Sequence, residues 1–271
     1  MYEQYWGLLE PPFSLTPDPR FLYLSRKHED ALMMLHYAIT RNKGAGLLTG
    51  DIGYGKTTVS RKLLELLDPV NYKVVMIVDP LLSPAQMLRE ILDQLGAECT
   101  GRTRQAMVSA LHGTLLSAYE RGQRVVLLVD EAHLIKSSQT FEELRLLLNC
   151  QMNDQFLMNL LLMGQLELRQ RLEKVPALKQ RIAVKYELKA LDPQETGEMI
   201  AHRMRVAGYA NGQSPFTPDA VFEIHRVSGG TPRLVSQLAD NALMVGMAQG
   251  LKLIDGVTMH SITEDYEERA A

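Results

Sequence analysis

Apolar runs and amphipathic segments alternate along most of the chain. The runs are rich in valine, leucine and isoleucine and lie at 44–49, 73–78, 125–129, 159–163 and 182–188. Continuous apolar runs of this length are typical of strands that are covered on both faces. Because helical segments separate them, we expect right-handed crossovers and a parallel sheet in an α/β fold.

The segments between these runs have the periodicity of helices. Expected helices cover 58–67, 84–95, 106–119 and 140–150. In the first of them, apolar residues at positions 59, 63, 66 and 67 share one face. Gly96 is a stop signal for the second helix.

The C-terminal part of the chain has helix signals instead. Asp192 is a helix N-cap, Pro193 occupies the first helical position, and Glu195 is placed to close a capping box. Two Thr-Pro pairs farther along mark the starts of two more helices. We therefore expect a small all-helical domain over 192–271.

One motif lies between the first apolar run and the first helix. Its glycines let the backbone bend so that successive N–H groups point at phosphate oxygens, and the following helix N-terminus favours an anion. Lys56 can reach the outer phosphates, and the Thr57 hydroxyl can ligate Mg²⁺. The alternative is a glycine-rich turn that binds nothing. The candidate binding residues are Gly50, Asp51, Ile52, Gly53, Tyr54, Gly55, Lys56, Thr57 and Thr58.

An acidic pair follows the run at 125–129. Asp130 and Glu131 would lie at the carboxyl end of a central strand, where open α/β sheets bind ligands. Asp130 can hold the Mg²⁺ shell, and Glu131 can activate the attacking water. The nearby phosphate-binding motif disfavours the alternative of two acidic residues that begin a surface loop. With Ala132 and His133 the pair spells a box found in helicases, but the chain has no room for a second motor domain.

Polar residues beyond the acidic pair extend the candidate site. Gln165 lies at the tip of the fourth run, which we expect to be the neighbour of the strand that ends at Asp130. Its amide could hold the attacking water or touch the γ-phosphate; capping the next helix is the alternative. The stretch 166–191 holds seven Lys/Arg against three Asp/Glu. Arg169, Arg171 and Arg181 are candidates for an arginine that reaches a neighbouring subunit's nucleotide. For each, the alternative is a solvated or ion-paired side chain.

Arg233 lies in the first turn of the third helix expected in the C-terminal domain. The helix dipole opposes a cation there, which favours a functional reason for this arginine. It would reach the triphosphate only if the helical domain folds back over the sheet. The alternative is an arginine that binds a local carboxylate.

Composition narrows the classes of function. Hydrophobic residues make up 46% and charged residues 23% of the chain, as in ordinary soluble globular proteins. No apolar run is long enough to span a bilayer and no signal-peptide pattern is visible, so we expect a cytoplasmic protein. A net charge of −3 argues against a strongly basic nucleic-acid surface but leaves room for a local patch. Cys99 and Cys150 are expected to be buried, reduced thiols.

Several stretches together follow a family pattern, and the opening stretch is the most specific of them. They are Tyr2, Tyr5-Trp6-Gly7-Leu8, Pro12-Phe13-Ser14-Leu15-Thr16-Pro17-Asp18-Pro19-Arg20-Phe21-Leu22-Tyr23, Gly50 to Thr58, Val129 to His133, Gly164 to Leu168, Gln180-Arg181-Ile182 and Ser228 to Arg233. With these residues the chain resembles the AAA+ ATPases over nearly its whole length. More narrowly, it resembles the secretion-pathway protein A group (ExeA/GspA and MshM-like proteins).

The resemblance implies a fold and ligands. The fold is a P-loop three-layer αβα sandwich with a parallel sheet over 1–191, followed by a helical lid over 192–271. The ligands are ATP and Mg²⁺. An N-terminal segment, 1–40, would pack near the adenine, where Pro12 and Phe13 would line the pocket.

The resemblance also implies individual roles. Thr57 and Asp130 would bind the metal, Glu131 would act on the water, and Gln165 would be the first sensor. Arg181 would be the finger that acts in a neighbouring subunit, and Arg233 the second sensor. Family members assemble through neighbouring subunits, so we expect self-association into a ring or a filament.

Three functions remain open from the sequence. The first is an ATP-driven assembly switch for a secretion or pilus machine. Relatives that assemble a secretin carry a membrane segment and a peptidoglycan-binding domain, and we see neither, so we expect a soluble member or one that a partner anchors. The alternative is an ATP-dependent DNA-binding regulator of transposition that recruits a transposase; the basic stretch 166–191 favours it, and the net charge opposes it. A third is a nucleotide-binding interaction module with negligible turnover.

Overall fold

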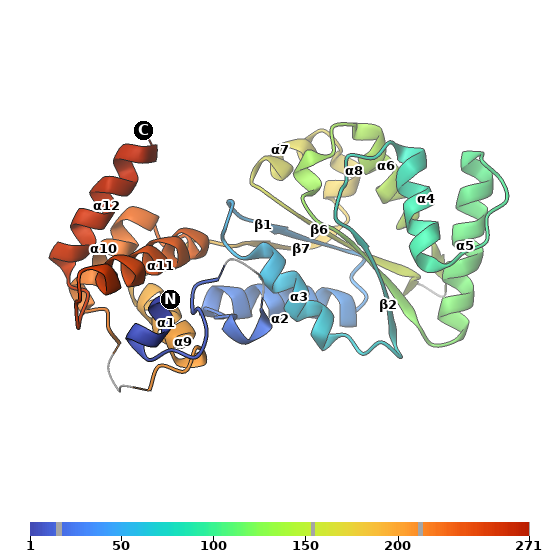
Figure 1. Ribbon diagram of the computed structural model, residues 1–271. Coiled ribbons are helices and arrows are strands. Elements are labelled where there is room, and N and C mark those ends of the chain that lie inside the picture. The colour runs from blue at the N-terminus through green and yellow to red at the C-terminus, as the bar shows by residue number, and fades with distance from the viewer. Residues whose placement is uncertain (15–17, 153–154, 211–213, 271) are drawn as a thin grey trace. The chain divides into compact units, whose positions relative to one another are not determined.

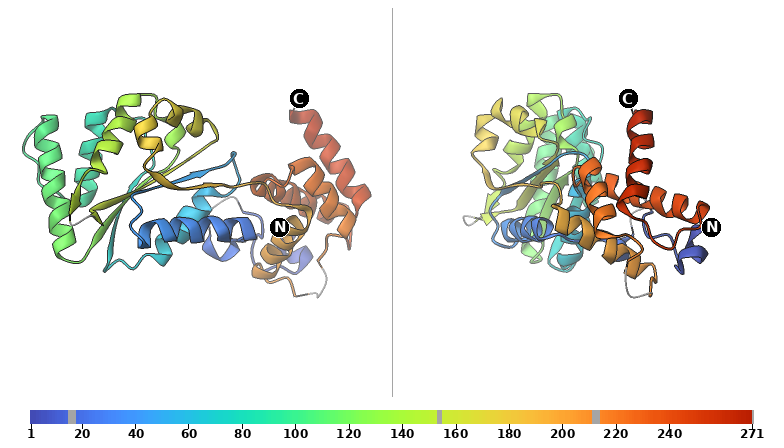
Figure 2. Two further views of the ribbon diagram at one scale, coloured as in Figure 1. Left: turned by 180° about the vertical axis from the view of Figure 1, so that it is seen from behind. Right: turned by 90° about the vertical axis from the view of Figure 1, so that its left-hand side faces the viewer.

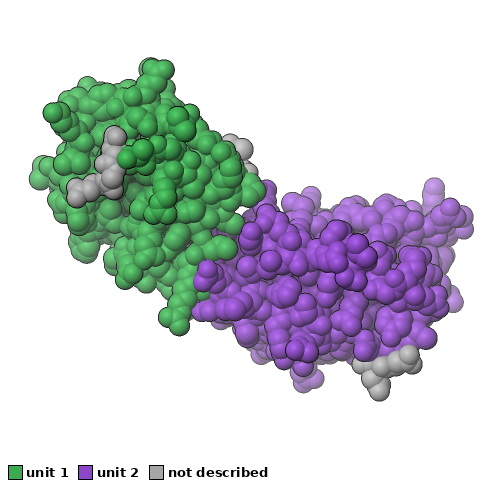
Figure 3. Space-filling model, turned by 90° about the horizontal axis from the view of Figure 1, so that it is seen from below, with its two compact units in different colours: residues 1–27, 189–271 green, residues 28–188 purple. Residues whose placement is uncertain are grey.

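The chain forms two compact units, each with a hydrophobic core of its own. Unit 1 combines residues 1–27 with 189–271, and unit 2 is residues 28–188 (Figure 3). This structure, a computed structural model, describes residues 1–14, 18–152, 155–210 and 214–270.

Unit 2 is built on a five-stranded parallel sheet (Figure 1). The strand order is β2-β3-β6-β1-β7. The strands are β1 (Ala45–Thr49), β2 (Tyr72–Ile77), β3 (Arg124–Val129), β6 (Met158–Gly164) and β7 (Ile182–Glu187). The apolar runs therefore predicted all five strands, and the expected pairing of β3 with β6 is confirmed.

Helices cover both faces of this sheet, as Figures 1 and 2 show. Successive residues of a strand point to opposite faces, so Leu127 and Val129 join one core while Val126 and Leu128 join the other. The first core includes residues of α4 (Pro84–Leu95), α5 (Arg104–Glu120), α6 (Ser138–Leu147), α7 (Glu167–Glu173) and α8 (Pro176–Lys179). The second includes residues of α2 (Arg26–Thr40) and α3 (Lys56–Leu66). The predicted three-layer αβα architecture is confirmed.

Several elements of unit 2 lie outside the predicted ones. These are α2, the 3-10 helix η2 (Ala132–Leu134), the antiparallel pair of β4 (Gln151–Met152) with β5 (Gln155–Phe156), and the helices α7 and α8. Of these, α2 matters most for the site, because it packs beside the turn that follows β1.

Unit 1 is helical. Its elements are α1 (Tyr2–Trp6), the 3-10 helix η1 (Pro19–Phe21), α9 (Pro193–Val206), α10 (Pro218–Ser228), α11 (Pro232–Ala248) and α12 (Gly256–Ala270). The capping box predicted at the start of α9 is present, with Asp192 and Glu195 each accepting the other's backbone N–H. Among the described residues, no helix combines the length and the apolar character needed to cross a membrane.

The N-terminal segment packs in the core of unit 1. Tyr2, Trp6 and Phe13 are buried in the same cluster as residues of α9 and α11. The Trp6 indole N–H donates to the Leu243 carbonyl at 2.9 Å, and its ring lies where a side chain at position 246 would be, so Gly246 permits the contact. These contacts group residues 1–27 with the helical unit, whereas the sequence analysis had placed them in a domain over 1–191. The second boundary, between 188 and 189, lies close to the expected one.

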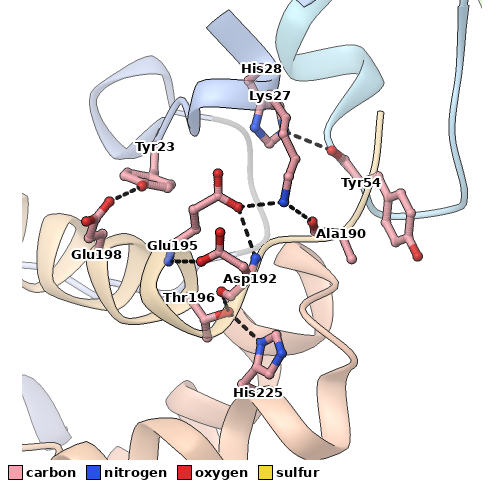
Figure 4. A network of polar contacts seen from close by, with 10 residues as sticks. All are labelled: Tyr23, Lys27, His28, Tyr54, Ala190, Asp192, Glu195, Thr196, Glu198 and His225. Carbon is pink, nitrogen blue, oxygen red and sulfur yellow. Dashed lines mark hydrogen bonds and ion pairs between the residues drawn. The ribbon is translucent and has the colours of Figure 1, made fainter. Parts of the chain in front are cut away.

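A polar network ties the end of this segment to α9 (Figure 4). The Lys27 ammonium donates to the Ala190 carbonyl at 2.8 Å and to Glu195 at 2.9 Å. The Tyr23 hydroxyl donates to Glu198 at 2.6 Å, and burial together with this carboxylate raises the pKa of Tyr23. Unit 1 is thus assembled from both ends of the chain.

Candidate nucleotide-binding site

The phosphate-binding motif forms the turn between β1 and α3. Gly53 and Gly55 have φ angles of 80° and 92°, in a region that favours glycine. At Gly50 a side chain is excluded by a close approach, since its Cβ would lie 3.0 Å from the Leu188 carbonyl oxygen. Thr57 is exposed in the first turn of α3. The strand, turn and helix that the motif requires are therefore present.

The Lys56 side chain is buried within this turn. Its ammonium donates to the carbonyl oxygens of Gly50 at 2.9 Å and Asp51 at 3.0 Å. Burial lowers the pKa of Lys56, while the charges of Glu131, Asp130 and Asp51 act in the opposite direction. The buried ammonium is suited to bind a phosphate group, and the carboxylates around it are suited to bind a metal ion.

Asp130 and Glu131 lie at the same edge of the sheet as this turn. Strand β6 lies between β1 and β3, and the three run parallel, so their carboxyl ends meet. Asp130 is 5% exposed, and its Oδ1 accepts the Glu131 backbone N–H at 2.8 Å. The two motifs therefore lie at the same edge of the sheet.

Glu131 has an unusual backbone and an unusual side chain. Its φ angle is 47°, and its Oε2 lies 3.2 Å from Nδ1 of His133. The Gln165 backbone N–H donates to the same Nδ1 at 3.3 Å, so this nitrogen carries no proton for Glu131. Oε2 is consequently buried with no hydrogen-bond partner within the part of the chain that the structure describes. Such an oxygen is suited to a water or a ligand group.

Gln165 follows β6 directly and is half-buried. The N-cap of α7 is Leu166, without a side-chain cap, so the alternative of Gln165 as the N-cap is not realised. A Cβ at Gly164 would lie 3.0 Å from the His133 backbone nitrogen. Glycine at this position thus allows η2 to pack closely against the end of β6.

Two of the candidate arginines are held within unit 2. Arg169 donates to the Thr49 hydroxyl at 3.2 Å and pairs with Glu187 at 2.6 Å. Arg171 donates to the Ile135 carbonyl at 3.0 Å. Both side chains have local partners, which agrees with the alternative given for them.

Arg181 lies at the other edge of the sheet. It precedes Ile182, which begins β7 and is in register with Ala45 at the start of β1. The length of β1, about 16 Å at 3.3 Å per residue, separates this position from the phosphate-binding turn. The guanidinium donates to Asn149 at 2.6 Å, and its Nη1 is buried without a partner among the described residues. Arg181 is thus too far away to act on a phosphate bound in its own turn.

Among the described residues, two of the seven cations in the stretch 166–191 are ion-paired: Arg169 with Glu187, and Lys179 with Glu173 at 2.6 Å. Arg171 and Arg181 donate to neutral groups. The exposed lysines of the stretch are Lys174, Lys185 and Lys189. The stretch therefore keeps an excess of positive charge, as its sequence indicated.

Three predicted site residues belong to unit 1. Phe13 is 2% exposed and packs edge-on against Phe216, with ring centroids 6.3 Å apart. The Pro12 carbonyl accepts from Arg203 at 3.3 Å. Arg233 is exposed in the first turn of α11. A contact of Pro12 or Phe13 with adenine, and of Arg233 with a phosphate, stays a prediction.

One residue that the sequence analysis did not single out touches the phosphate-binding turn. His28, in the first turns of α2, places Nε2 2.9 Å from the Tyr54 carbonyl oxygen (Figure 4). The buried residues Ala31, Leu32 and Leu35 lie three, four and seven positions after it. This helical periodicity was legible in the sequence and would have placed His28 on the buried face.

Comparison with known proteins identifies the domain. Residues 39–172 match the family described as AAA domain. The chain is 39% identical over 261 residues to General secretion pathway protein A of Aeromonas hydrophila. The match covers 94% of this chain but 47% of that relative, so the chain spans about half of the relative's length.

Solved structures share the fold at low sequence identity. The ORC2 protein of Aeropyrum pernix, in ADPNP–ADP complexes, is 17% identical with a TM-score of 0.68, over 94% of this chain and 71% of that one. Cdc6p of Pyrobaculum aerophilum is 20% identical with a TM-score of 0.68, over 90% and 67%. The RuvB branch migration motor of Thermotoga maritima is 20% identical with a TM-score of 0.57, over 89% and 69%. The family match, the strand order and the phosphate-binding turn together show that residues 39–172 form an AAA domain, and the solved structures share its fold.

Proposed function

We propose that this chain is a Mg²⁺-dependent ATP hydrolase that works as an ATP-driven assembly switch. An AAA domain implies nucleotide binding. The observation that carries the proposal is the buried, unpartnered Oε2 of Glu131 at the edge that also holds the buried Lys56. A carboxylate oxygen in that position can accept a proton from an attacking water.

The other residues of this edge have complementary roles. The backbone N–H groups of 50–58 and the Lys56 ammonium hold the phosphates. Thr57 and Asp130 would hold Mg²⁺, and bound Mg²⁺ supplies positive charge that neutralises the phosphate oxygens. Gln165 orients the attacking water. The charge balance around Lys56 supports this assignment, because burial disfavours the charged ammonium while four nearby carboxylates favour it.

Arg181 completes the site of a neighbouring subunit. Its separation from the turn of its own chain, by the length of a strand, supports a role in trans. Subunits therefore associate into a ring or a filament with nucleotide sites between them. Arg233 acts as the second sensor from the helical unit.

The partner of this switch is a component of a secretion or pilus machine. The similarity to General secretion pathway protein A supports this part of the proposal. In the organism that carries the gene, we expect its deletion to reduce protein secretion or surface pili, and a copy with Glu131→Gln to fail to restore them. Normal secretion and normal pili in the deletion strain would contradict the assignment of the partner.

Glu131→Gln tests the proposed chemistry. The amide keeps the shape of the side chain but accepts a proton poorly, so we expect turnover to fall by about 10²-fold or more while ATP binding persists. Phosphate release and the dissociation constant for ATP, measured on the same preparation, separate the two effects. Light scattering would show whether the variant stays assembled with ATP. Turnover at the wild-type rate would remove Glu131 from the mechanism.

A further inference from the structure

The side chain that approaches the phosphate-binding turn from α2 is His28. It is 2% exposed, and its Nε2 lies 2.9 Å from the Tyr54 carbonyl oxygen. A carbonyl oxygen can only accept, so Nε2 carries the proton and donates it to this oxygen. The sequence analysis assigned no role to this histidine, and the roles proposed for the site do not use it.

This hydrogen bond fixes the orientation of one peptide group. The peptide that joins Tyr54 to Gly55 is trans, so its C=O and its N–H point in opposite directions. Because His28 holds the C=O on the side of α2, the Gly55 N–H is directed away from α2. That N–H has no acceptor among the described residues. A free N–H at the start of a helix is suited to a phosphate oxygen.

The space around Gly55 is fitted to this arrangement. Its φ angle is 92°, and a Cβ would lie 2.6 Å from Nε2 of His28. Any larger residue would therefore displace the imidazole as well as strain the backbone. The ring in turn is fixed by α2, whose residues Leu35 and Ile39 are fully buried in the core shared with α3. Glycine and histidine thus form a matched pair at this point of the turn.

We propose that His28 is a positioning residue of the phosphate site, which holds the Tyr54 carbonyl outside the turn and so aims the Gly55 N–H at a bound phosphate. The inference deepens the proposed function and rests on it. It identifies the phosphates of the nucleotide, rather than its base or sugar, as the part whose affinity depends on His28.

Three substitutions distinguish positioning from packing. His28→Leu fills the space without a donor. His28→Gln carries an amide N–H that can extend to the position of Nε2, whereas the amide of His28→Asn corresponds to Nδ1 and falls short of the carbonyl. His36→Ala, on the same helix, is the matched control, since His36 lies eight residues farther along α2 and outside this contact.

The measurement is competition against a fluorescent ADP analogue by ADP and by adenosine. We expect His28→Leu and His28→Asn to weaken ADP about tenfold, the effect of one charge-assisted hydrogen bond. Adenosine should compete equally in all variants, and His28→Gln should bind ADP within about threefold of wild type. His36→Ala should match wild type for both competitors.

The outcomes separate this inference from the proposed function. If wild type binds no adenine nucleotide, the proposed function falls and this inference falls with it. If wild type binds ADP and His28→Leu binds it equally well, the inference alone is overturned. Equal loss of ADP and adenosine would show that His28 only fills space. Should His28→Leu fail to fold, the pair of Gln and Asn variants decides, and equal ADP affinity in these two contradicts the proposal.

Discussion

The two edges of the unit 2 sheet hold different parts of one proposed reaction. At the carboxyl edge, the ends of β1, β3 and β6 bring Lys56, Asp130, Glu131 and Gln165 together. At the amino edge, Arg181 binds Asn149 and has a second guanidinium nitrogen buried without a partner among the described residues. In the proposed mechanism, the carboxyl edge binds and polarises the nucleotide within one copy of the chain. Arg181 at the amino edge would act on the nucleotide of another copy.

Arg181→Ala gives the largest expected effect. Loss of a trans-acting arginine should lower turnover by about 10³-fold without changing ATP affinity. Mixing this variant with Glu131→Gln should restore part of the activity, because the Arg181→Ala subunit keeps an intact Glu131 and receives Arg181 from its neighbour. Lys179→Ala, a partly exposed neighbour paired with Glu173, is the control and should behave as wild type. Mixtures without any recovery would place Arg181 outside the neighbouring site.

Lys56→Ala breaks the carboxyl edge within each copy. We expect ATP affinity to fall by about 10²-fold, since a buried charge-assisted contact to phosphate is lost. Because these contacts lie within one copy of the chain, the loss of affinity should be the same at every protein concentration. Lys62→Ala, on the same helix but partly exposed and paired with Glu65, is the matched control. Isothermal titration of both variants with ATP checks the expectation, which unchanged affinity in Lys56→Ala would contradict.

His133→Ala tests a smaller contribution within the carboxyl edge. The Nδ1 of His133 accepts the Gln165 backbone N–H and lies beside Glu131. Loss of the imidazole should therefore leave the positions of Gln165 and Glu131 less well fixed. We expect kcat to fall about tenfold with little change in the ATP dissociation constant. His133→Asn, which keeps an acceptor near Nδ1, should retain more activity. His112→Ala, exposed on α5, serves as the control, and equal rates in all three variants would remove His133 from the site.

Glu223→Gln is the smallest expected change and should affect neither edge. Arg226, with contributions from His260 and Thr263, lowers the pKa of Glu223 to about 2. A carboxyl pKa that is lower in the folded than in the unfolded state stabilises unit 1 at every pH above the unfolded pKa of 4.5. This contribution is lost as the pH falls toward 2. We expect the free energy of unfolding of the variant to be about 2 kcal/mol lower than that of wild type at neutral pH. We also expect it to depend less on pH in the acid range.

Thermal unfolding from pH 7 to pH 2 measures this dependence. Glu264→Gln is the control, because Glu264 also contacts His260 but is exposed. Identical pH profiles of Glu223→Gln and wild type would contradict the assignment. ATP turnover at neutral pH should be unchanged in both variants.

The sequence predicted the carboxyl edge better than its surroundings. The apolar runs located all five strands, and the order of motifs then placed Asp130 and Gln165 on neighbouring strand ends. The position of Arg181 was also legible, because an arginine directly before a parallel strand must lie at the amino edge. These inferences succeed because they depend on local patterns and on the parallel direction of the strands.

The contributions of the first 40 residues were harder to predict. Ser25, a favoured N-cap residue, stands directly before α2, but the helix precedes the first strand and lies outside the alternation of strands and helices, so neither α2 nor His28 was predicted. The packing of Trp6 against Leu243 and Gly246 joins positions more than two hundred residues apart. A single sequence has no local pattern that specifies such a contact.

The chain passes between the units at two places, after Lys27 and after Leu188. The first residue after Lys27 is His28, whose Nε2 donates to the Tyr54 carbonyl. At the second, the Leu188 N–H donates to the Thr49 carbonyl at 2.7 Å, one residue before the turn begins. Both crossings between the units therefore begin at residues that hydrogen-bond the phosphate-binding turn or the residue before it, so a displacement of either connection would act first on the backbone of that turn.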